Sequence, residues 1–122
     1  MFIHYGAQEI LSYPETILIR RGMSISLEPC AAAEGGMMMK VTVLMENTAP
    51  SGLIHEHGLS LHLSYEGHSV LLDAGSSGRF AENAAALGVD LSAVEKAALS
   101  HGHWDHADGL AAFFACNTAA PV

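Results

Sequence analysis

The chain is poor in basic residues. Of its 122 residues only five are lysine or arginine, against 13 aspartates and glutamates, which gives a formal net charge of −8. So few cations cannot assemble the basic patch that nucleic acid or an anionic membrane surface requires. We therefore expect neither nucleic acid nor membrane as a partner.

Cysteines and long apolar runs are also scarce. The two cysteines, Cys30 and Cys116, form neither a CxxC pair nor a disulfide framework, which favours a reducing, cytoplasmic location. No apolar run approaches the roughly 20 residues that are needed to cross a bilayer. The N-terminus also lacks the basic segment and hydrophobic core of a secretory signal. The sequence thus predicts a cytoplasmic protein.

Half of the residues are hydrophobic, so we expect a folded domain rather than disorder. The length suits one domain but not a two-sheet sandwich with helices on both faces. Residues 1–36 show no sustained periodicity and are followed by three methionines at 37–39. We predict that 1–36 form an N-terminal extension, either disordered or upstream of the true start, and that 37–122 form the domain.

From Lys40 onward the hydrophobic pattern is regular. Alternating apolar residues predict strands, two of which form a hairpin, and spacing of three and four residues predicts helices. Gly88 is well placed to end the first helix. The expected elements are strands at 41–46, 59–65 and 69–73, a helix at 79–87, a short buried strand at 96–100 and a helix at 109–115.

Four side chains that can bind a metal lie within six residues directly after the last predicted strand. They are His101, His103, Asp105 and His106. Imidazole and carboxylate are the ligands that suit zinc and neighbouring transition metals. In extended backbone, residues i and i+2 project to the same side, so His101 and His103 can converge on one ion. We expect Gly102 to let the backbone fold tightly between them.

Asp105 and His106 are neighbours at the start of the next predicted helix. Adjacent side chains diverge, so this pair is better placed to bind a second ion than to complete the first site. Hydrolases with two metals hold their ions about 3.5–4 Å apart. We expect Trp104 to point elsewhere and pack. The alternatives are a chance polar loop or an adventitious metal binder.

The segment Ser100-His101-Gly102-His103-Trp104-Asp105-His106 resembles the metal-binding motif of the metallo-β-lactamase-fold hydrolases. Residues 71–75, Leu-Leu-Asp-Ala-Gly, are similar to the family's strand that ends in Asp-x-Gly. Residues 43–47 and 56–60 resemble the subgroup that includes the dihydropterin-forming ribofuranosylaminobenzene-phosphate synthases. The resemblance covers about residues 38–122.

The resemblance implies roles for individual residues. His101 and His103 would bind a first metal, and Asp105 and His106 a second. Asp105 would also be catalytic, orienting the bridging water or taking its proton. Asp73 would hydrogen-bond the metal loop and keep its ligands oriented. The cofactor would be two zinc ions, with manganese or iron as alternatives. Glu56 and His57 would lie in a loop that borders the pocket, but the residues taken alone predict exposed polar side chains rather than ligands.

The resemblance also implies an α+β fold, the αββα metallo-β-lactamase sandwich. This chain would hold its N-terminal half, a mixed sheet with helices on one face, and the remaining metal ligands would lie downstream. In the complete protein a metal-bound hydroxide would attack a small-molecule ester, amide or phosphoester. We expect the chain alone to be an inactive fragment that can self-associate through its uncovered sheet face.

Two alternatives remain open from the sequence. The first is a non-enzymatic metal-binding or interaction module that completes its sheet with a partner chain. The second is a transferase or oxidoreductase on the same scaffold, because one fold hosts many chemistries.

Overall fold

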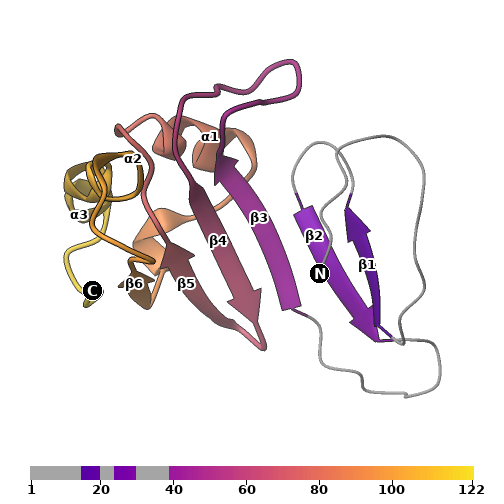
Figure 1. Ribbon diagram of the computed structural model, residues 1–122. Helices are drawn as coiled ribbons and strands as arrows, with labels where there is room; N and C mark the ends of the chain where they lie inside the picture. The colour runs from indigo at the N-terminus through magenta and orange to yellow at the C-terminus, as the bar shows by residue number, and fades with distance from the viewer. Residues whose placement is uncertain (1–14, 20–23, 30–38) are drawn as a thin grey trace.

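The computed structural model describes residues 15–19, 24–29 and 39–122. Within them, six strands form one mixed sheet in the order β1-β2-β3-β4-β5-β6 (Figure 1). Neighbouring strands are antiparallel except β5 and β6, which are parallel. The strands are β1 (Glu15–Ile19), β2 (Ser24–Pro29), β3 (Met39–Met45), β4 (Ser60–Tyr65), β5 (His68–Leu72) and β6 (Lys96–Ala98).

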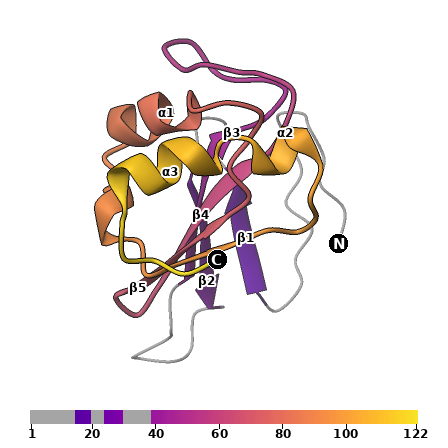
Figure 2. The same cartoon turned by 90° about the vertical axis from the view of Figure 1, so that its left-hand side faces the viewer.

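The helical segments follow β5 and β6 along the chain, and Figure 2 shows α1 and α3 in front of the strands. They are α1 (Phe80–Ala86), the 3-10 helix η1 (Leu91–Ala93), α2 (Trp104–Ala107) and α3 (Leu110–Cys116). The order of strands and helices predicted for residues 41–115 is confirmed. Gly88, just beyond the C-cap of α1, has a φ of 72°, the left-handed conformation that commonly ends a helix.

A tight turn joins β4 to β5 and sets the register of the predicted hairpin. Tyr65 pairs with His68, so only Glu66 and Gly67 form the loop. Both have positive φ, 48° and 83°, as a type I′ turn requires. This turn matches the twist of the two strands and delivers the end of β5 to the metal loop.

The core lies between the sheet and its helices. Leu44, Leu71 and Ala97 are buried on β3, β5 and β6, and Phe80 of α1 and Phe113 of α3 are fully buried with them. Because side chains alternate along a strand, the residues between these positions face the other way. The helices therefore cover one face of the sheet, as the sequence predicts.

The opposite face of the sheet is also apolar. Cross-strand pairs Val41–Leu63 and Val43–Leu61 bring aliphatic side chains of β3 and β4 together. These four residues are half-buried, and in the described part of the chain they lie outside the core that the helices cover. This face is the surface through which the sequence predicts self-association.

Two strands lie within the predicted N-terminal extension. β1 and β2 form an antiparallel pair, and β2 continues the sheet through β3, with Ser24 opposite Thr42 and Leu27 opposite Met39. The rest of the segment 1–36 and Cys30 lie outside the described residues, so the boundary at residue 36 stays a prediction. Among the described residues, no helix combines the length and apolar character that membrane crossing demands.

Candidate metal centre

The loop after β6 brings three of the predicted ligands together. His103 is the N-cap of α2, with extended backbone (φ −72°, ψ 148°), and Asp105 lies in the first turn of that helix. One potential ligand atom from each of His101, His103 and Asp105 lies within 4.8 Å of the other two. A single ion with bonds of about 2.0–2.2 Å can bridge such a group after small side-chain rotations.

His106 lies beside Asp105 and is held by a buried carboxylate. Its Nδ1 lies 2.7 Å from Asp73 Oδ2, and its Nε2 lies 3.5 Å from Asp105 Oδ2. An ionised carboxylate only accepts hydrogen bonds, so Nδ1 carries a proton, and Nε2 is the ring nitrogen left for a metal. The His106 ring also lies beside that of His101, with ring centroids 4.2 Å apart, so all four predicted ligands lie close together. The assignment of each side chain to one of two ions stays a prediction.

Asp73 ties the end of β5 to the metal loop. Its side chain is buried, and it accepts hydrogen bonds from Ser100 N (2.7 Å), Ser100 Oγ (2.6 Å) and His106 Nδ1. Burial alone would raise the pKa of the Asp73 carboxyl, but the hydrogen bonds from Ser100 and His106 together lower this pKa below its ordinary value of 3.8. Asp73 is therefore a charged acceptor at neutral pH.

Backbone hydrogen bonds also hold the metal loop, residues 101–106, against the rest of the fold. Ala74 N donates to His106 O at 2.7 Å, and Leu59 N donates to Asp105 O at 3.2 Å. Gly58 has a φ of 139°, and a Cβ there would lie 2.2 Å from Asp105 O. The chain before β4 thus needs glycine at 58 to approach α2.

The expectation for Gly102 is wrong. Its φ lies outside the left-handed region, and a Cβ there would meet nothing within 4 Å. The expectation that Trp104 packs is also wrong, because 57% of this residue is exposed. Its ring lies 5.7 Å from that of His57, centroid to centroid. Helix α2 turns the Trp104 side chain outward beside the candidate ligands.

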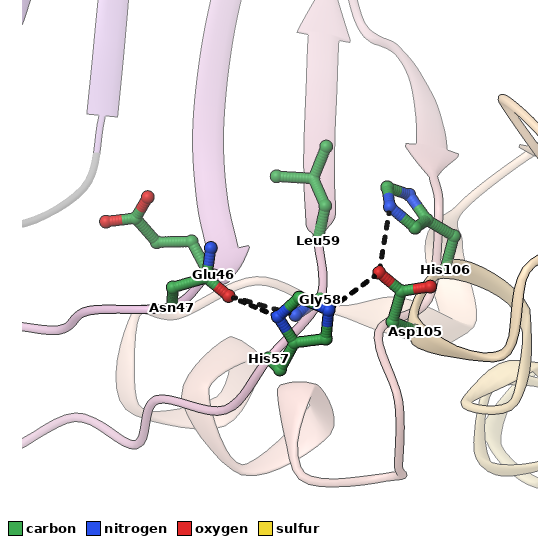
Figure 3. Close-up of a pocket in the computed structure, with 7 residues that line it drawn as sticks. All are labelled: Glu46, Asn47, His57, Gly58, Leu59, Asp105 and His106. Carbon is green, nitrogen blue, oxygen red and sulfur yellow. Dashed lines mark hydrogen bonds and ion pairs between the residues drawn. The ribbon is translucent and has the colours of Figure 1, made fainter.

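His57 and Asn47 belong to the site, and the sequence reasoning missed their contacts. His57 Nε2 lies 3.3 Å from Asp105 Oδ2, and its Nδ1 lies 3.1 Å from Asn47 Oδ1 (Figure 3). The Glu56 carboxylate instead accepts a hydrogen bond from Ser77 Oγ at 2.9 Å. The sequence did contain a signal for these contacts. Glu56-His57-Gly58 directly precedes the predicted strand at 59–65, and this strand begins beside the metal loop.

An open pocket lies between the loop that joins β3 to β4 and the loop that carries the candidate ligands. Its volume is about 330 Å³. Seven residues line it: Glu46, Asn47, His57, Gly58, Leu59, Asp105 and His106.

Two other histidines lie in the hairpin, as expected, and outside this pocket. His68 Nδ1 lies 3.0 Å from Glu95 Oε2. Burial and the charge of Lys40 lower the pKa of His62 below 6.5, so this side chain is neutral at neutral pH.

Known proteins resemble this chain in sequence and fold. Residues 58–115 match the model of the metallo-beta-lactamase superfamily. A solved structure described as a metal-dependent hydrolase of the beta-lactamase superfamily is 40% identical with a TM-score of 0.50, over 59% of this chain and 26% of its own. A HARLDQ-motif mutant metallo-beta-lactamase from Cronobacter sakazakii is 26% identical with a TM-score of 0.52, over 66% of this chain and 30% of its own.

An uncharacterized protein of Methanocaldococcus jannaschii is 31% identical over 70 residues, which are 57% of this chain and 27% of that protein. The chain thus spans between a quarter and a third of the length of these relatives. The predicted fold class, part of a metallo-β-lactamase fold with a mixed sheet and helices, is confirmed. Residues 58–115, just under half of the chain, are thus similar to the metallo-beta-lactamase superfamily.

Proposed function

We propose that this chain forms the metal-binding part of a hydrolase that uses two zinc ions. One observation carries the proposal: His101, His103 and Asp105 converge, and the adjacent His106 is oriented by a buried carboxylate. Neutral imidazoles and a carboxylate fit zinc, and manganese or iron would also suit this mixed set. A ligand histidine whose outer nitrogen donates to a carboxylate is a recurrent feature of such sites.

His101 and His103 would hold the first ion, and Asp105 and His106 the second. When bound, the metal supplies Lewis-acid activation of water and of the group to be cleaved. Asp105 is the catalytic residue in this proposal, because its carboxylate lies close to His101, His103 and His106 and can accept the proton of the attacking water. The Asp73 carboxylate keeps His106 in one tautomer and orientation.

The substrate would be a small ester, amide or phosphoester that enters the pocket of about 330 Å³ beside Asp105 and His106. The subgroup of dihydropterin-forming ribofuranosylaminobenzene-phosphate synthases is one specific candidate. It rests on the motif at 56–60, whose His57 and Gly58 contact Asp105. This motif therefore lies at the pocket, where a difference between subgroups would affect the substrate.

Residues 39–122 alone would bind metal with little turnover, because the chain spans about a quarter to a third of its relatives. The apolar face of β3 and β4 would be covered by further protein, or by a second copy of the chain. We infer a cytoplasmic location from the two cysteines of the sequence, which show neither CxxC spacing nor the pattern of a disulfide framework. A metal-binding module without catalysis is the alternative.

Metal removal tests the proposal. We expect the protein that contains these residues to hydrolyse a chromogenic ester or phosphodiester, to lose this activity on dialysis against a chelator, and to recover it when zinc is added. The same assays on the 122-residue chain distinguish metal binding by this part from hydrolysis by the complete site. Hydrolysis that persists unchanged after complete metal removal would contradict the proposal.

A further inference from the structure

We propose that His57 is a positioning residue of the metal centre, which holds the Asp105 carboxylate so that one of its oxygens stays available to a cation. This inference rests on the proposed metal site. It assigns a role in metal binding to a side chain on the loop between β3 and β4, outside the HxHxDH motif.

Two imidazoles approach the same oxygen of Asp105. His57 Nε2 lies 3.3 Å from Oδ2, and His106 Nε2 lies 3.5 Å from it. Among the described residues, no hydrogen bond or ion pair reaches the side-chain oxygen Oδ1. The carboxylate thus has one oxygen in contact with two imidazoles and one that is left for a cation.

The His57 ring is itself oriented by the protein. Asn47 Oδ1 lies 3.1 Å from His57 Nδ1 and also accepts a hydrogen bond from Gly58 N at 3.3 Å. The loop is closed at its base by a backbone hydrogen bond from Glu56 N to Glu46 O, 3.2 Å long. A side chain that is 68% exposed is therefore held at both ring nitrogens (Figure 3).

The geometry favours positioning over direct coordination. His57 is not part of the group whose ligand atoms all lie within 4.8 Å of one another, which comprises His101, His103 and Asp105. Groups that orient a metal ligand through a hydrogen bond typically change metal affinity by about 10- to 100-fold when removed, while the ion still binds. His57 is placed to act in this way on Asp105.

His68 provides a matched control. It too is an exposed histidine that pairs with a carboxylate, Glu95 at 3.0 Å, but its carboxylate lies in the segment before β6, outside the metal loop. Removal of either imidazole takes away one exposed ion pair. Only the removal of His57 changes the surroundings of a proposed metal ligand.

The test is a Co²⁺ and Zn²⁺ titration of the 122-residue chain and its variants, with the absorption spectrum of bound Co²⁺ as a second readout. We expect His57→Ala to weaken metal binding about 10-fold without changing the number of bound ions. His57→Gln places an amide N–H near the position of Nε2 and is expected to restore most of the affinity. His68→Ala is expected to leave affinity and spectrum unchanged.

Three results would overturn the inference. Unchanged affinity and spectrum in His57→Ala would show that His57 does not position Asp105. Loss of a whole ion from His57→Ala, without rescue by glutamine, would show that His57 is a ligand instead. Failure of the unsubstituted chain to bind either metal would overturn the proposed metal site as well. Normal binding that depends on His103 but not on His57 would refute the positioning role alone.

Discussion

Gly109→Ala is expected to destabilise the fold by about 3 kcal/mol or more, because the added methyl group has no space. A Cβ at this position would lie 1.8 Å from Ala74 O and 2.6 Å from Ser77 O. Both contacts are with backbone atoms, so no change of rotamer relieves them. Gly109 N also donates to Gly75 O at 3.1 Å, at the point where α3 begins. Urea unfolding of the metal-free chain measures the loss.

Gly102→Ala is the control for this substitution. It lies between two candidate ligands, has an ordinary φ and would place its Cβ in open space. We expect a change in unfolding free energy within about 0.5 kcal/mol, as for other unconstrained surface positions. Equal stability of the two variants would show that the close approach of α3 to residues 74–77 is not a feature of the folded protein.

Asp73→Asn is expected to lower the unfolding free energy of the metal-free chain by about 1.5–3 kcal/mol at neutral pH, the usual contribution of hydrogen bonds to a charged group. Asparagine keeps the shape of the side chain and tolerates the φ of 58° at this position. It places an amide where Ser100 and His106 now meet a carboxylate. The loop that carries the candidate ligands should then be held less tightly to the end of β5.

The same variant should alter the dependence of stability on pH. Because the pKa of Asp73 is lower in the folded chain than its ordinary value of 3.8, the unfolded chain binds more protons as the solution is acidified. The stabilisation is present above the ordinary pKa and is lost as the pH falls from about 5 through the lowered pKa of the folded state. Asp73→Asn should lack this part of the acid sensitivity.

Asp90→Asn is a suitable comparison. Asp90 accepts hydrogen bonds from Ser92 N and Ser92 Oγ, and these lower its pKa, as the bonds from Ser100 do for Asp73. Asp90 is exposed, and the hydrogen bonds that its side chain accepts from described residues stay within its own turn, so we expect a smaller change in stability. A larger effect at Asp90 than at Asp73 would contradict the role given to the buried carboxylate.

The sequence predicted the elements that local pattern controls. Alternation and the Glu66-Gly67 turn define the β4–β5 hairpin, and Gly88 ends α1 where a left-handed residue is needed. The four candidate ligands are also local, since six consecutive residues contain them all. Such features depend on neighbours in the chain, and a single sequence shows them directly.

Features that depend on contact between distant segments were missed. The contact of His57 with Asp105 joins the loop before β4 to α2, and no periodicity marks it. The backbone contacts that require glycine lie at Gly58 and Gly109 rather than at Gly102, because only the packed fold shows which backbones approach closely. Trp104 is exposed for the same reason, since its surroundings are set by the direction of a short helix.

The number of zinc ions that the chain binds tests the central claim most directly. After equilibrium dialysis against zinc and elemental analysis, the unsubstituted 122-residue chain should retain at least one zinc per molecule, and His103→Ala should lose it, because one of three converging donors is removed. A chain without stoichiometric zinc, or a His103→Ala variant with unchanged zinc content, would contradict the account.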